Sequence, residues 1–590
     1  MTITGRAFAD IVIRGGTVVD GLGSEPFRAD VLIVGDRIVA IGPAIESNAN
    51  HQIDASGCIV TPGFIDVHTH YDGQAIWSRR LAPSSSHGVT TVIMGNCGVG
   101  FAPCREEDHG RLVSVMEGVE DIPEIVMTSG LPWTWRTFPE YLDALESGQR
   151  DIDTVAYLPH SALRVYAMGE RGAMRAPAAP EDLSCMASLV VEALSAGALG
   201  FSTASVPVHR TSTGAYTPSF GAAQAELMAV ATAIRRAGRG IIQMLIDFSD
   251  GDPAAHIEFM KKLSRASGGL VTFTLAQIDS RPDLWRTILE ILEAANREPD
   301  VMIRAQVFPR PIGMLLGHEL SLNPFTLCPS YAALASLSLE RKVQELRQPD
   351  VRRRLLSELP VQPKQPLALM ARNFAHMFAL GDPPVYEPAP GSSIAAQSRM
   401  KRLSPEELAY DLLLEKGGRG LLISALANYS DYSLDPTLDM LNHPDCLPGL
   451  GDGGAHYGMI CDASFPTFML THWTRDRDGA KLSISQAIAA LTRRPALAFG
   501  FDDRGMIASG AKADVNIIDY DKLRLHAPHV CADLPAGGKR LDQSATGYRA
   551  TICSGQVIAR NDTPTGATPG KVIRARSPTL DAHGGPSAIG

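Results

Sequence analysis

The middle of the chain, from about residue 61 to residue 500, alternates short apolar runs rich in β-forming residues with longer amphipathic stretches. The runs include TTVIMGN (90–96), DTVAYL (153–158), GALGFST (197–203), RGIIQMLI (239–246) and GLVTFTL (269–275). Strands that alternate with helices are typical of βαβ units in a parallel sheet. The region is long enough for eight such units with insertions, so the rhythm predicts an α/β fold, a (β/α)8 TIM-like barrel.

The two ends of the chain have a different pattern, with short alternating strands separated by glycine-containing turns. They read IVIRGGTVVD and ADVLIVGDRIVAIGP near the N-terminus, and GMIASGAKADVNIID and ATICSGQVIAR near the C-terminus. Neither set has enough strands for a stable core of its own. We therefore expect residues 1–60 and 501–575 to form one composite β-sandwich domain, with the barrel of residues 61–500 inserted between them and residues 576–590 as a flexible tail.

The barrel rhythm breaks after VMIRAQVFPRP. SLERKVQELRQ and VRRRLLSEL read as helices, DPPVYEPAPG (382–391) is a Pro-rich loop, and Ser404-Pro405 is typical of a helix N-terminus. We expect an inserted helical segment at about 312–412. Such an insertion forms either a lid or pocket wall, or an oligomer contact.

Composition limits the partners of the chain. Hydrophobic residues make up 45% of it and the formal net charge is -10, without a long basic run, which argues against nucleic acid or an anionic membrane as a partner. We see no apolar stretch that fits a signal peptide or a membrane span. The nine cysteines follow no disulfide or CxxC spacing. We expect a cytoplasmic protein with a small-molecule substrate, and a homo-oligomer.

The segment TPGFIDVHTHYDG (61–73) carries the strongest chemical signal. Its apolar run reads as a strand, and His68 and His70 are two residues apart, so both imidazoles point to the same side. At the carboxyl end of a barrel strand, where active sites of this fold lie, the pair is placed to bind one metal ion.

PGFIDVHTH after a small β module resembles the amidohydrolase superfamily, whose first barrel strand carries a metal-binding HxH. The chain further resembles the N-acyl-D-amino-acid deacylase (D-aminoacylase) branch. The matching segments are GVTTVIMGNCGVGFAP (88–103), GALGFST (197–203), GDGGAH (451–456) and LTRRPALAFGFDDRGMIASGAKADVNIID (491–519). The resemblance covers nearly the whole chain and is weakest in the insertion. It implies the barrel, the composite β domain and hydrolysis of an amide bond.

The resemblance also implies roles for individual residues. It makes Cys97, after the second strand, a zinc ligand beside His68 and His70. Asp452 matches the essential aspartate of the last strand, which is expected to bind metal, accept a proton from metal-activated water and pass it to the leaving nitrogen. His456 is a candidate substrate-binding residue, although contact with the metal or a structural role fits its position equally well.

The chain departs from this branch on the fifth and sixth strands, where members carry metal-binding histidines. The matching runs, GIIQMLIDFSD and VTFTLAQIDSRP, contain none, and Gln243 and Gln277 are the nearest polar residues. Glutamine is a weak zinc ligand, so we expect one Zn²⁺ per chain, with the two glutamines turned toward substrate. Arg310 (in FPRP), which follows a further predicted strand, is another candidate because its guanidinium suits a carboxylate.

Together these features predict a zinc-dependent hydrolase of N-acyl (D-)amino acids or related N-acyl amides, with Asp452 as general base and acid. A cyclic amide or lactone hydrolase is one alternative. It ranks lower because no lysine of the kind that is carboxylated in dihydropyrimidinase-type members lies in strand 239–246 or near Cys97. A non-catalytic scaffold or ligand-binding relative is the other alternative, favoured by the absent histidines and opposed by the retention of the other four residues.

Overall fold

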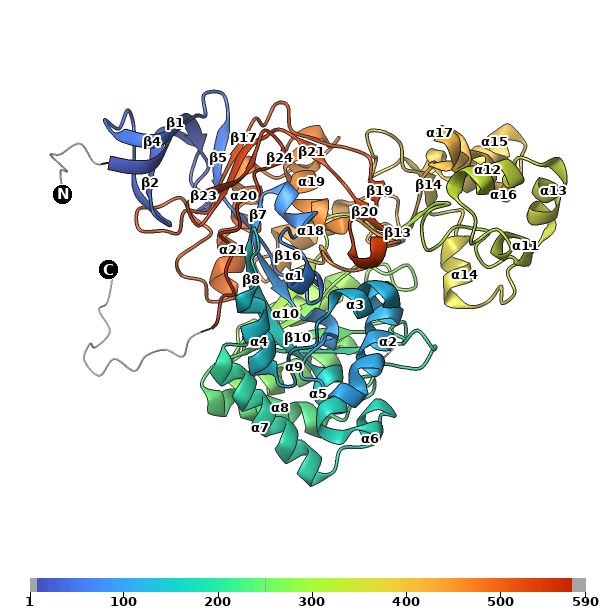
Figure 1. Cartoon of the computed structure of the whole chain (residues 1–590), viewed down its shortest axis with the longest axis horizontal. Helices are drawn as coiled ribbons and strands as arrows, with labels where there is room; N and C mark the ends of the chain where they lie inside the picture. The colour runs from blue at the N-terminus through green and yellow to red at the C-terminus, as the bar shows by residue number, and fades with distance from the viewer. Residues whose placement is uncertain (1–7, 250, 576–590) are drawn as a thin grey trace.

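The computed structural model describes residues 8–249 and 251–575 (Figure 1), so the predicted tail 576–590 lies outside the described residues. Eight parallel strands pair in chain order. They are β6 (Phe64–Asp66), β7 (Val89–Met94), β8 (Asp153–Pro159), β9 (Gly200–Ser205), β10 (Ile241–Ile246), β11 (Val271–Thr274), β12 (Ile303–Val307) and β16 (Cys446–Pro448). A single parallel bridge, Thr69 to Gly453, links the first strand region to the last. The predicted barrel is therefore confirmed, as a nearly closed one.

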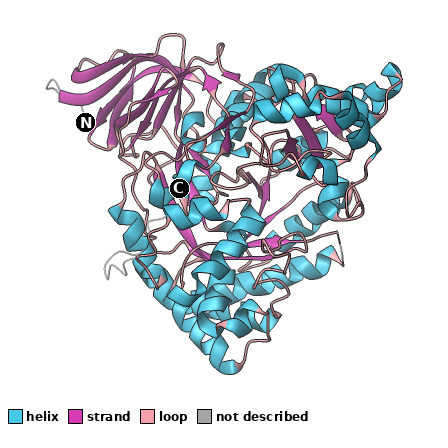
Figure 2. Cartoon of the chain, turned by 45° about the vertical axis from the view of Figure 1, so that its right-hand side comes forward, coloured by secondary structure: helices cyan, strands magenta, loops and turns pink. Residues whose placement is uncertain are grey.

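Helices cover the outside of the barrel (Figure 2). The amphipathic stretches expected between strands form α7 (Pro180–Ala196) and α8 (Gln224–Ala237), followed by α9 (Pro253–Ser267) and α10 (Leu284–Asn296). In α10 the apolar side chains recur every three or four residues, so one face carrying Trp285, Ile288 and Leu292 is buried.

The N-terminal half of the barrel has further helices between its strands. They are α1 (Gln74–Trp77), α2 (His109–Glu120), α3 (Glu124–Gly130), α4 (Phe138–Ser147), α5 (His160–Met168) and α6 (Glu170–Ala173). The last strand is flanked by α18 (Asp435–Asn442), α19 (Phe465–Thr471), α20 (Ile484–Leu491) and α21 (Arg493–Ala498).

Both ends of the described chain contribute to one nine-stranded mixed sheet, which confirms the composite β domain. The N-terminal part supplies β1 (Phe8–Val18), β2 (Phe27–Val34), β3 (Arg37–Gly42), β4 (Asn48–Asp54) and β5 (Ile59–Pro62). The C-terminal part supplies β17 (Val515–Ile518), β22 (Tyr548–Cys553), β23 (Gln556–Arg560) and β24 (Thr563–Pro564). The two parts join where β5 pairs antiparallel with β17, and they share one apolar core that includes Ile13, Val60, Val515 and Ile552.

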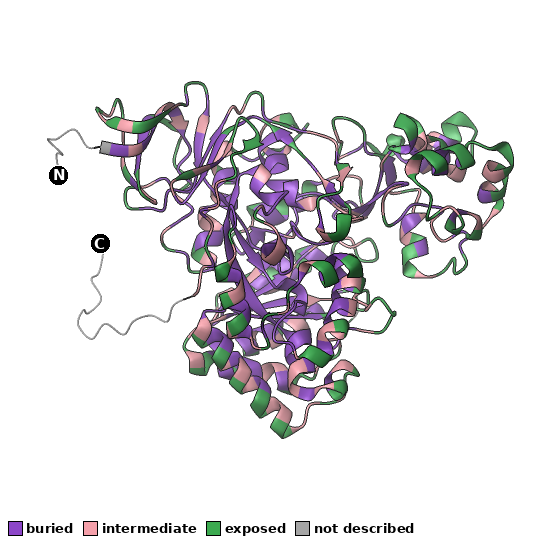
Figure 3. Ribbon diagram, in the orientation of Figure 1, coloured by how far each residue is buried: buried purple, intermediate pink, exposed green. Residues whose placement is uncertain are grey.

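The expected insertion after the seventh strand is a separate lobe, on the right of Figure 1. Its helices are α11 (Pro329–Ala332), α12 (Leu339–Leu346), α13 (Pro349–Ser357), α14 (Pro366–Ala371), α15 (Ile394–Lys401), α16 (Pro405–Leu413) and α17 (Glu415–Gly418). It also holds an antiparallel sheet of β13 (Ile312–Leu316), β14 (Met377–Ala379) and β15 (Leu422–Ala427). The lobe has its own small core, and its helices are far more exposed than the barrel strands (Figure 3).

The remaining short strands are two antiparallel pairs, β18 (Arg524–Leu525) with β21 (Ala545–Thr546) and β19 (His529–Cys531) with β20 (Arg540–Asp542). Within the described part of the chain, no helix has both the length and the apolar character needed to cross a membrane.

Candidate metal centre

The closure of the barrel places the last strand region against the HxH segment. The N–H of Asp452 donates to the carbonyl of His68 (3.1 Å), and the N–H of His70 donates to the carbonyl of Gly453 (2.8 Å). As a result, Oδ1 of Asp452 lies 3.5 Å from Nε2 of His68 and 3.7 Å from Nε2 of His70. The structure therefore brings together three of the predicted metal-binding residues.

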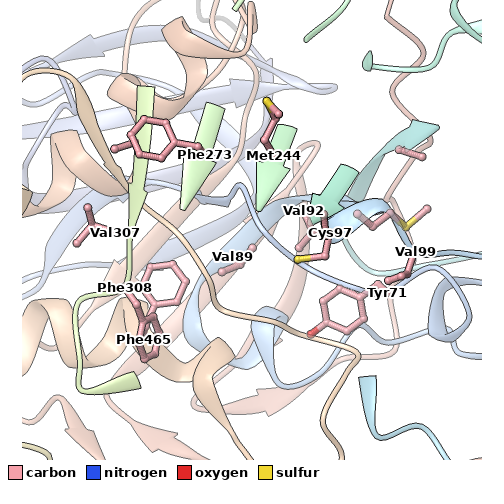
Figure 4. Packing of buried hydrophobic residues seen from close by; sticks show 14 of the residues in the cluster. Tyr71, Val89, Val92, Cys97, Val99, Met244, Phe273, Val307, Phe308 and Phe465 are labelled. Carbon is pink, nitrogen blue, oxygen red and sulfur yellow. The ribbon is translucent and has the colours of Figure 1, made fainter. Parts of the chain in front are cut away.

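Cys97 comes to the same place from the end of β7. Its Sγ lies 3.3 Å from Nε2 of His68, and ligand atoms of His68, His70 and Cys97 all lie within 4.8 Å of one another. Figure 4 shows Cys97 among buried residues that include Val92, Val99 and Tyr71. The four predicted metal-binding residues thus form one buried cluster at the carboxyl ends of the strands.

Three residues of this region adopt left-handed backbone conformations, with φ of 55° at Cys97, 45° at Asp452 and 50° at His456. Such conformations are costly for residues other than glycine and persist where surrounding contacts impose them, often at functional sites. At Cys97 the contact is with Gln243 on β10, whose Oε1 accepts the Cys97 backbone N–H at 2.9 Å.

The donor set of the cluster fits zinc. Two imidazoles and a thiol, with a carboxylate beside them, are ligands that zinc prefers. Oδ1 of Asp452 and Nδ1 of His70 are buried without a hydrogen-bond partner, which is rare in folded proteins and needs an explanation. A cation bound among these side chains would satisfy Asp452.

The electrostatics of the buried cluster point the same way. Burial raises the pKa of the Cys97 thiol, and the nearby Glu120 and Asp452 raise it further. Burial is also the main cause that raises the pKa of Asp452 and lowers the pKa of His68 to about 4. Burial thus favours the neutral forms, and a divalent cation would favour the thiolate and the carboxylate instead.

Gln306 on β12 orients His68, a role that the sequence prediction missed. Its Oε1 lies 2.6 Å from Nδ1 of His68. Since the amide oxygen accepts, Nδ1 carries the proton and the lone pair on Nε2 faces Cys97 and Asp452. Partners of this kind fix the tautomer and ring direction of metal-binding histidines. The signal was a single amide side chain inside the apolar strand run VMIRAQVFPRP.

Glu120, the last residue of α2, was also missed. It is 1% exposed, with Oε1 lying 3.4 Å from Nδ1 of His70 and Oε2 lying 3.4 Å from Nε2 of His456. Glu120 follows Met116 by four residues on the buried face of α2, so the available signal was an acidic residue on an apolar helix face.

The predicted substrate-binding residues differ in their surroundings. Gln243 lies beside Cys97, and its Nε2 is buried without a hydrogen-bond partner. His456 reaches the cluster through Glu120. The amide of Gln277 is instead used by Asp431 and by the backbone N–H of Ser430.

Arg310 is fully buried, and its guanidinium donates to Asp462 (2.8 Å), Ser464 and the carbonyl of Cys461. Among the described residues, no hydrogen bond or ion pair connects either Gln277 or Arg310 with the four predicted metal-binding residues. Their assignment to the substrate site stays a prediction, and their protein partners favour a structural role.

Two other histidines follow barrel strands. His160 is buried between Thr203 and Glu226, and both of its ring nitrogens are used by these contacts, which fits a structural role. Nδ1 of His209 has no hydrogen-bond partner among the described residues, and burial together with the neighbouring histidines, His209 among them, lowers the pKa of His70. His209 therefore lies close to the metal centre, on the loop after β9.

The cluster opens on one side. The side chains of Asp452 and His456 are 20% and 26% exposed, whereas those of His68 and His70 are 0% and 1% exposed. A cavity of about 10 Å³, lined by residues that include Asp452 and Tyr457, adjoins the Asp452 side chain and is close to the smallest volume that holds a water molecule. A substrate would therefore approach from Asp452 and His456.

Comparison with known proteins places this arrangement in context. Residues 52–559 match the model of the amidohydrolase family. The chain is 28% identical over 516 residues to N-acyl-D-glutamate deacylase of Alcaligenes xylosoxydans xylosoxydans, which covers 87% of this chain and 88% of that protein. It is 28% identical over 341 residues to D-aminoacylase of the same organism, which covers 57% of this chain and 66% of that protein.

Solved structures of similar proteins share the fold. A D-aminoacylase with a binuclear metal centre aligns with a TM-score of 0.64 at 22% identity, over 96% of this chain and all of that one. N-acyl-D-glutamate deacylase from Bordetella bronchiseptica, in complex with zinc and a phosphonate inhibitor, aligns with the same TM-score and coverage at 23% identity. At these identities the likeness establishes the barrel with its composite sheet.

Proposed function

The chain belongs to the amidohydrolase family, and we propose that it is a zinc-dependent hydrolase of N-acyl-D-amino acids or of related N-acyl amides. The observation that carries the proposal is the convergence of His68, His70 and Cys97 from two strand ends beside Asp452 from a third. The two similar proteins of Alcaligenes xylosoxydans xylosoxydans, named N-acyl-D-glutamate deacylase and D-aminoacylase, support the substrate class.

His68, His70 and Cys97 would hold the zinc, with Asp452 beside it. Bound there, zinc supplies positive charge that acidifies water and polarises a carbonyl group. Gln306 keeps Nε2 of His68 unprotonated, and Gln243 holds the strained backbone of Cys97. These two contacts thus orient His68 and Cys97 toward the centre before the substrate arrives.

Asp452 is the proposed proton carrier. Its Oδ1 lies among the ligands and has no hydrogen-bond partner, while its side chain is partly exposed at the open side. This position lets one carboxylate take the proton from the attacking water and hand it to the amide nitrogen that leaves. The products are a carboxylic acid and a free amine.

One zinc per chain is favoured over two. The oxygen of Gln243 is already used by the Cys97 N–H, and the oxygen of Gln277 by the N–H of Ser430. Each amide oxygen is thus already engaged with a backbone N–H, and a neutral amide is in any case a weak ligand for a second zinc on the fifth or sixth strand. The free Nε2 of Gln243 is instead a donor suited to a substrate carbonyl or carboxylate oxygen.

The setting of the enzyme is part of the proposal. Nine free cysteines suit a reducing compartment, which supports the cytoplasm. We propose a small-molecule substrate as the partner, and a homo-oligomer, for which the exposed lobe offers additional surface.

The test combines metal content with a substrate panel. The purified protein is assayed for zinc by mass spectrometry, for amine release from N-acetyl-D- and N-acetyl-L-amino acids, and for ring opening of a hydantoin and of a lactone. About one zinc and turnover of N-acyl-D-amino acids support the proposal. Turnover of only the hydantoin or the lactone favours the cyclic amide or lactone alternative, and a zinc-free protein that is inactive after zinc supplementation favours a non-catalytic scaffold.

A further inference from the structure

Glu120 joins two imidazoles that the proposed chemistry treats separately. One carboxylate oxygen faces Nδ1 of His70 and the other faces Nε2 of His456, each at 3.4 Å. His70 belongs to the buried metal cluster, and His456 belongs to its open side. Glu120 therefore connects His70, in the buried part of the site, with His456 at its open side.

Two of these four polar atoms have no hydrogen-bond partner among the described residues. Nδ1 of His70 and Oε2 of Glu120 are both buried and unpaired, although buried polar groups in folded proteins are almost always hydrogen-bonded. A buried carboxylate is also costly unless it is paired. A shift of a few tenths of an ångström would convert both contacts into hydrogen bonds, with the imidazole N–H groups donating and Glu120 accepting.

The surrounding structure holds Glu120 in place. Asp121, which ends α2 with φ of 51°, accepts from the hydroxyl of Ser321 (2.8 Å) and from the N–H of Gly458 (2.9 Å). At Gly118, a Cβ atom would lie 2.2 Å from the backbone of Thr211. The end of α2 is thus packed directly on the loop after β9 and tied to the start of the inserted lobe.

We propose that Glu120 is a positioning residue of the metal centre. By accepting the Nδ1–H of His70, it fixes the ring so that Nε2 carries the lone pair and faces Asp452 and the zinc position. By accepting the Nε2–H of His456, it also sets the direction of the imidazole at the entrance. The inference rests on the metal-binding part of the proposed function and not on its substrate.

This role predicts an effect on zinc affinity that is independent of turnover. A carboxylate that accepts from a metal-binding histidine raises the basicity of that ligand and restricts its ring, and loss of such a partner typically weakens metal binding by about 10- to 100-fold. Glu120→Gln keeps the size of the side chain but removes its charge and one acceptor oxygen.

The experiment measures the zinc dissociation constant by competition with a chromogenic chelator. Wild type is compared with Glu120→Gln and with the control Glu117→Gln, which lies on the same helix and accepts only a backbone N–H. We expect weakening by about 10- to 100-fold in Glu120→Gln and a change of less than about twofold in the control. Unchanged affinity in Glu120→Gln would overturn the proposal.

A second comparison separates positioning from general loosening of the fold. In a His70→Ala background, Glu120→Gln should cause little further loss of zinc affinity, because its target is gone. An equal loss in both backgrounds would contradict the proposal. If Glu120→Gln does not fold, His456→Gln replaces it, with a smaller weakening expected because His70 keeps its contact, and an unchanged affinity would count against the proposed link.

The outcome is distinguishable from failure of the proposed function. Zinc binding that depends on Glu120 in a protein that hydrolyses no amide would leave this inference standing and remove the substrate assignment. Amide hydrolysis by a protein whose zinc affinity does not depend on Glu120 would support the substrate assignment and overturn this inference.

Discussion

The two ends of the barrel each bury a cluster of charged and polar side chains, and the clusters differ in how completely the protein satisfies them. At the carboxyl ends of the strands, His70, Glu120 and Asp452 retain buried polar atoms without partners. At the amino ends, Asp153, the first residue of β8, meets Arg504, Lys512 and Asp514 from the segment that leads into β17.

In the cluster at the amino ends of the strands, the charged side chains are paired with one another. Asp153 accepts from Arg504 (2.7 Å) and Lys512 (2.6 Å) with one oxygen, and from the N–H of Lys571 with the other. Asp514 accepts from Lys512 and from the N–H of Ser554. Burial alone would raise the pKa of Asp153, but the charges of Lys512 and Arg504 outweigh it, and the net pKa lies below the ordinary value.

The difference separates a structural cluster from a binding site. At the amino ends of the strands, each charged side chain lies beside an opposite charge of the protein, so no bound ion or ligand is needed to neutralise it. This cluster joins the barrel to the composite sheet. At the carboxyl ends of the strands, the lone pairs of His68, His70, Cys97 and Asp452 point toward one place, and the protein does not supply a hydrogen-bond donor for each of them. Both clusters contain almost fully buried ionisable side chains, such as Glu120 at one end and Asp153 at the other, so burial by itself identifies neither.

The largest effect is expected from Asp452→Asn. An amide cannot take up and return the proton, so kcat should fall by about 10³- to 10⁴-fold, the upper part of the range for an acid–base group that acts in two steps. Zinc content, measured by mass spectrometry, should stay at the wild-type value. The exposed Asp502→Asn is the control and should keep full activity. Residual activity near that of wild type in Asp452→Asn would remove Asp452 from the chemistry.

Lys512→Met tests the structural cluster. It leaves Asp153 and Asp514 buried beside a neutral side chain, and breaking a buried ion pair in this way costs about 3–5 kcal/mol. Urea unfolding should show this loss, while zinc stoichiometry of the folded protein stays unchanged. The surface pair of Lys522 with Asp519 provides the control, since Lys522→Met should leave the stability nearly unchanged. A loss of zinc in Lys512→Met would break the distinction between the two ends.

Cys97→Ser tests the binding site, and its expected effect is the converse of that of Lys512→Met: zinc affinity falls while stability is kept. A hydroxyl is a poor replacement for a thiolate, so zinc affinity should fall by about 100-fold, at least as much as for loss of a supporting residue. Unfolding of the zinc-free protein should be nearly unchanged. Cys104→Ser, also buried but outside the cluster, should retain wild-type zinc affinity, and equal losses in the two variants would argue against a metal at Cys97.

The smallest effect is a pH dependence that arises outside both clusters. Burial lowers the pKa of His87 to about 4, and the neutral ring bonds with the hydroxyl of Thr467 and the carbonyl of Gln543. Below pH 6.5 the unfolded chain binds a proton that the folded chain does not bind until about pH 4. Stability is therefore lost as the pH falls through this window, by on the order of 1–3 kcal/mol.

Urea unfolding of the zinc-free protein between pH 7 and pH 4 measures this loss. His87→Gln should show a shallower pH dependence than wild type across the window, whatever its stability at pH 7. The exposed His51→Gln should run parallel to wild type. Parallel curves for His87→Gln and wild type would show that His87 does not cause the slope.

The inserted lobe shows which features the sequence pattern predicts and which it does not. The helix start at Ser404 is confirmed, with a capping box between Ser404 and Glu407, because a cap depends on residues three positions apart. The run LLISALA (421–427), however, has the character of a barrel strand, yet β15 pairs antiparallel with β13 and β14 inside the lobe. An apolar run does not reveal which strand it pairs with, because strand pairing depends on residues far apart in the sequence.

The candidate site divides in the same way. His68 and His70 follow from the two-residue period of a strand, and the resemblance to a known family added Cys97 and Asp452 at the ends of other strands. In any barrel of parallel strands those ends meet, so the sequence by itself determined the fold and the four residues at the centre.

Only the tertiary structure decided which side chains support them. Gln306 meets His68 across 238 residues of chain, and Glu120 reaches His70 from the end of a helix rather than from a strand end. Gln243 and Gln277 looked alike in the sequence, yet one holds Cys97 and the other holds the 428–431 loop. Periodicity fixes the face on which a residue lies, but the partner on that face depends on how whole elements pack, and packing is set by contacts between residues far apart in the chain.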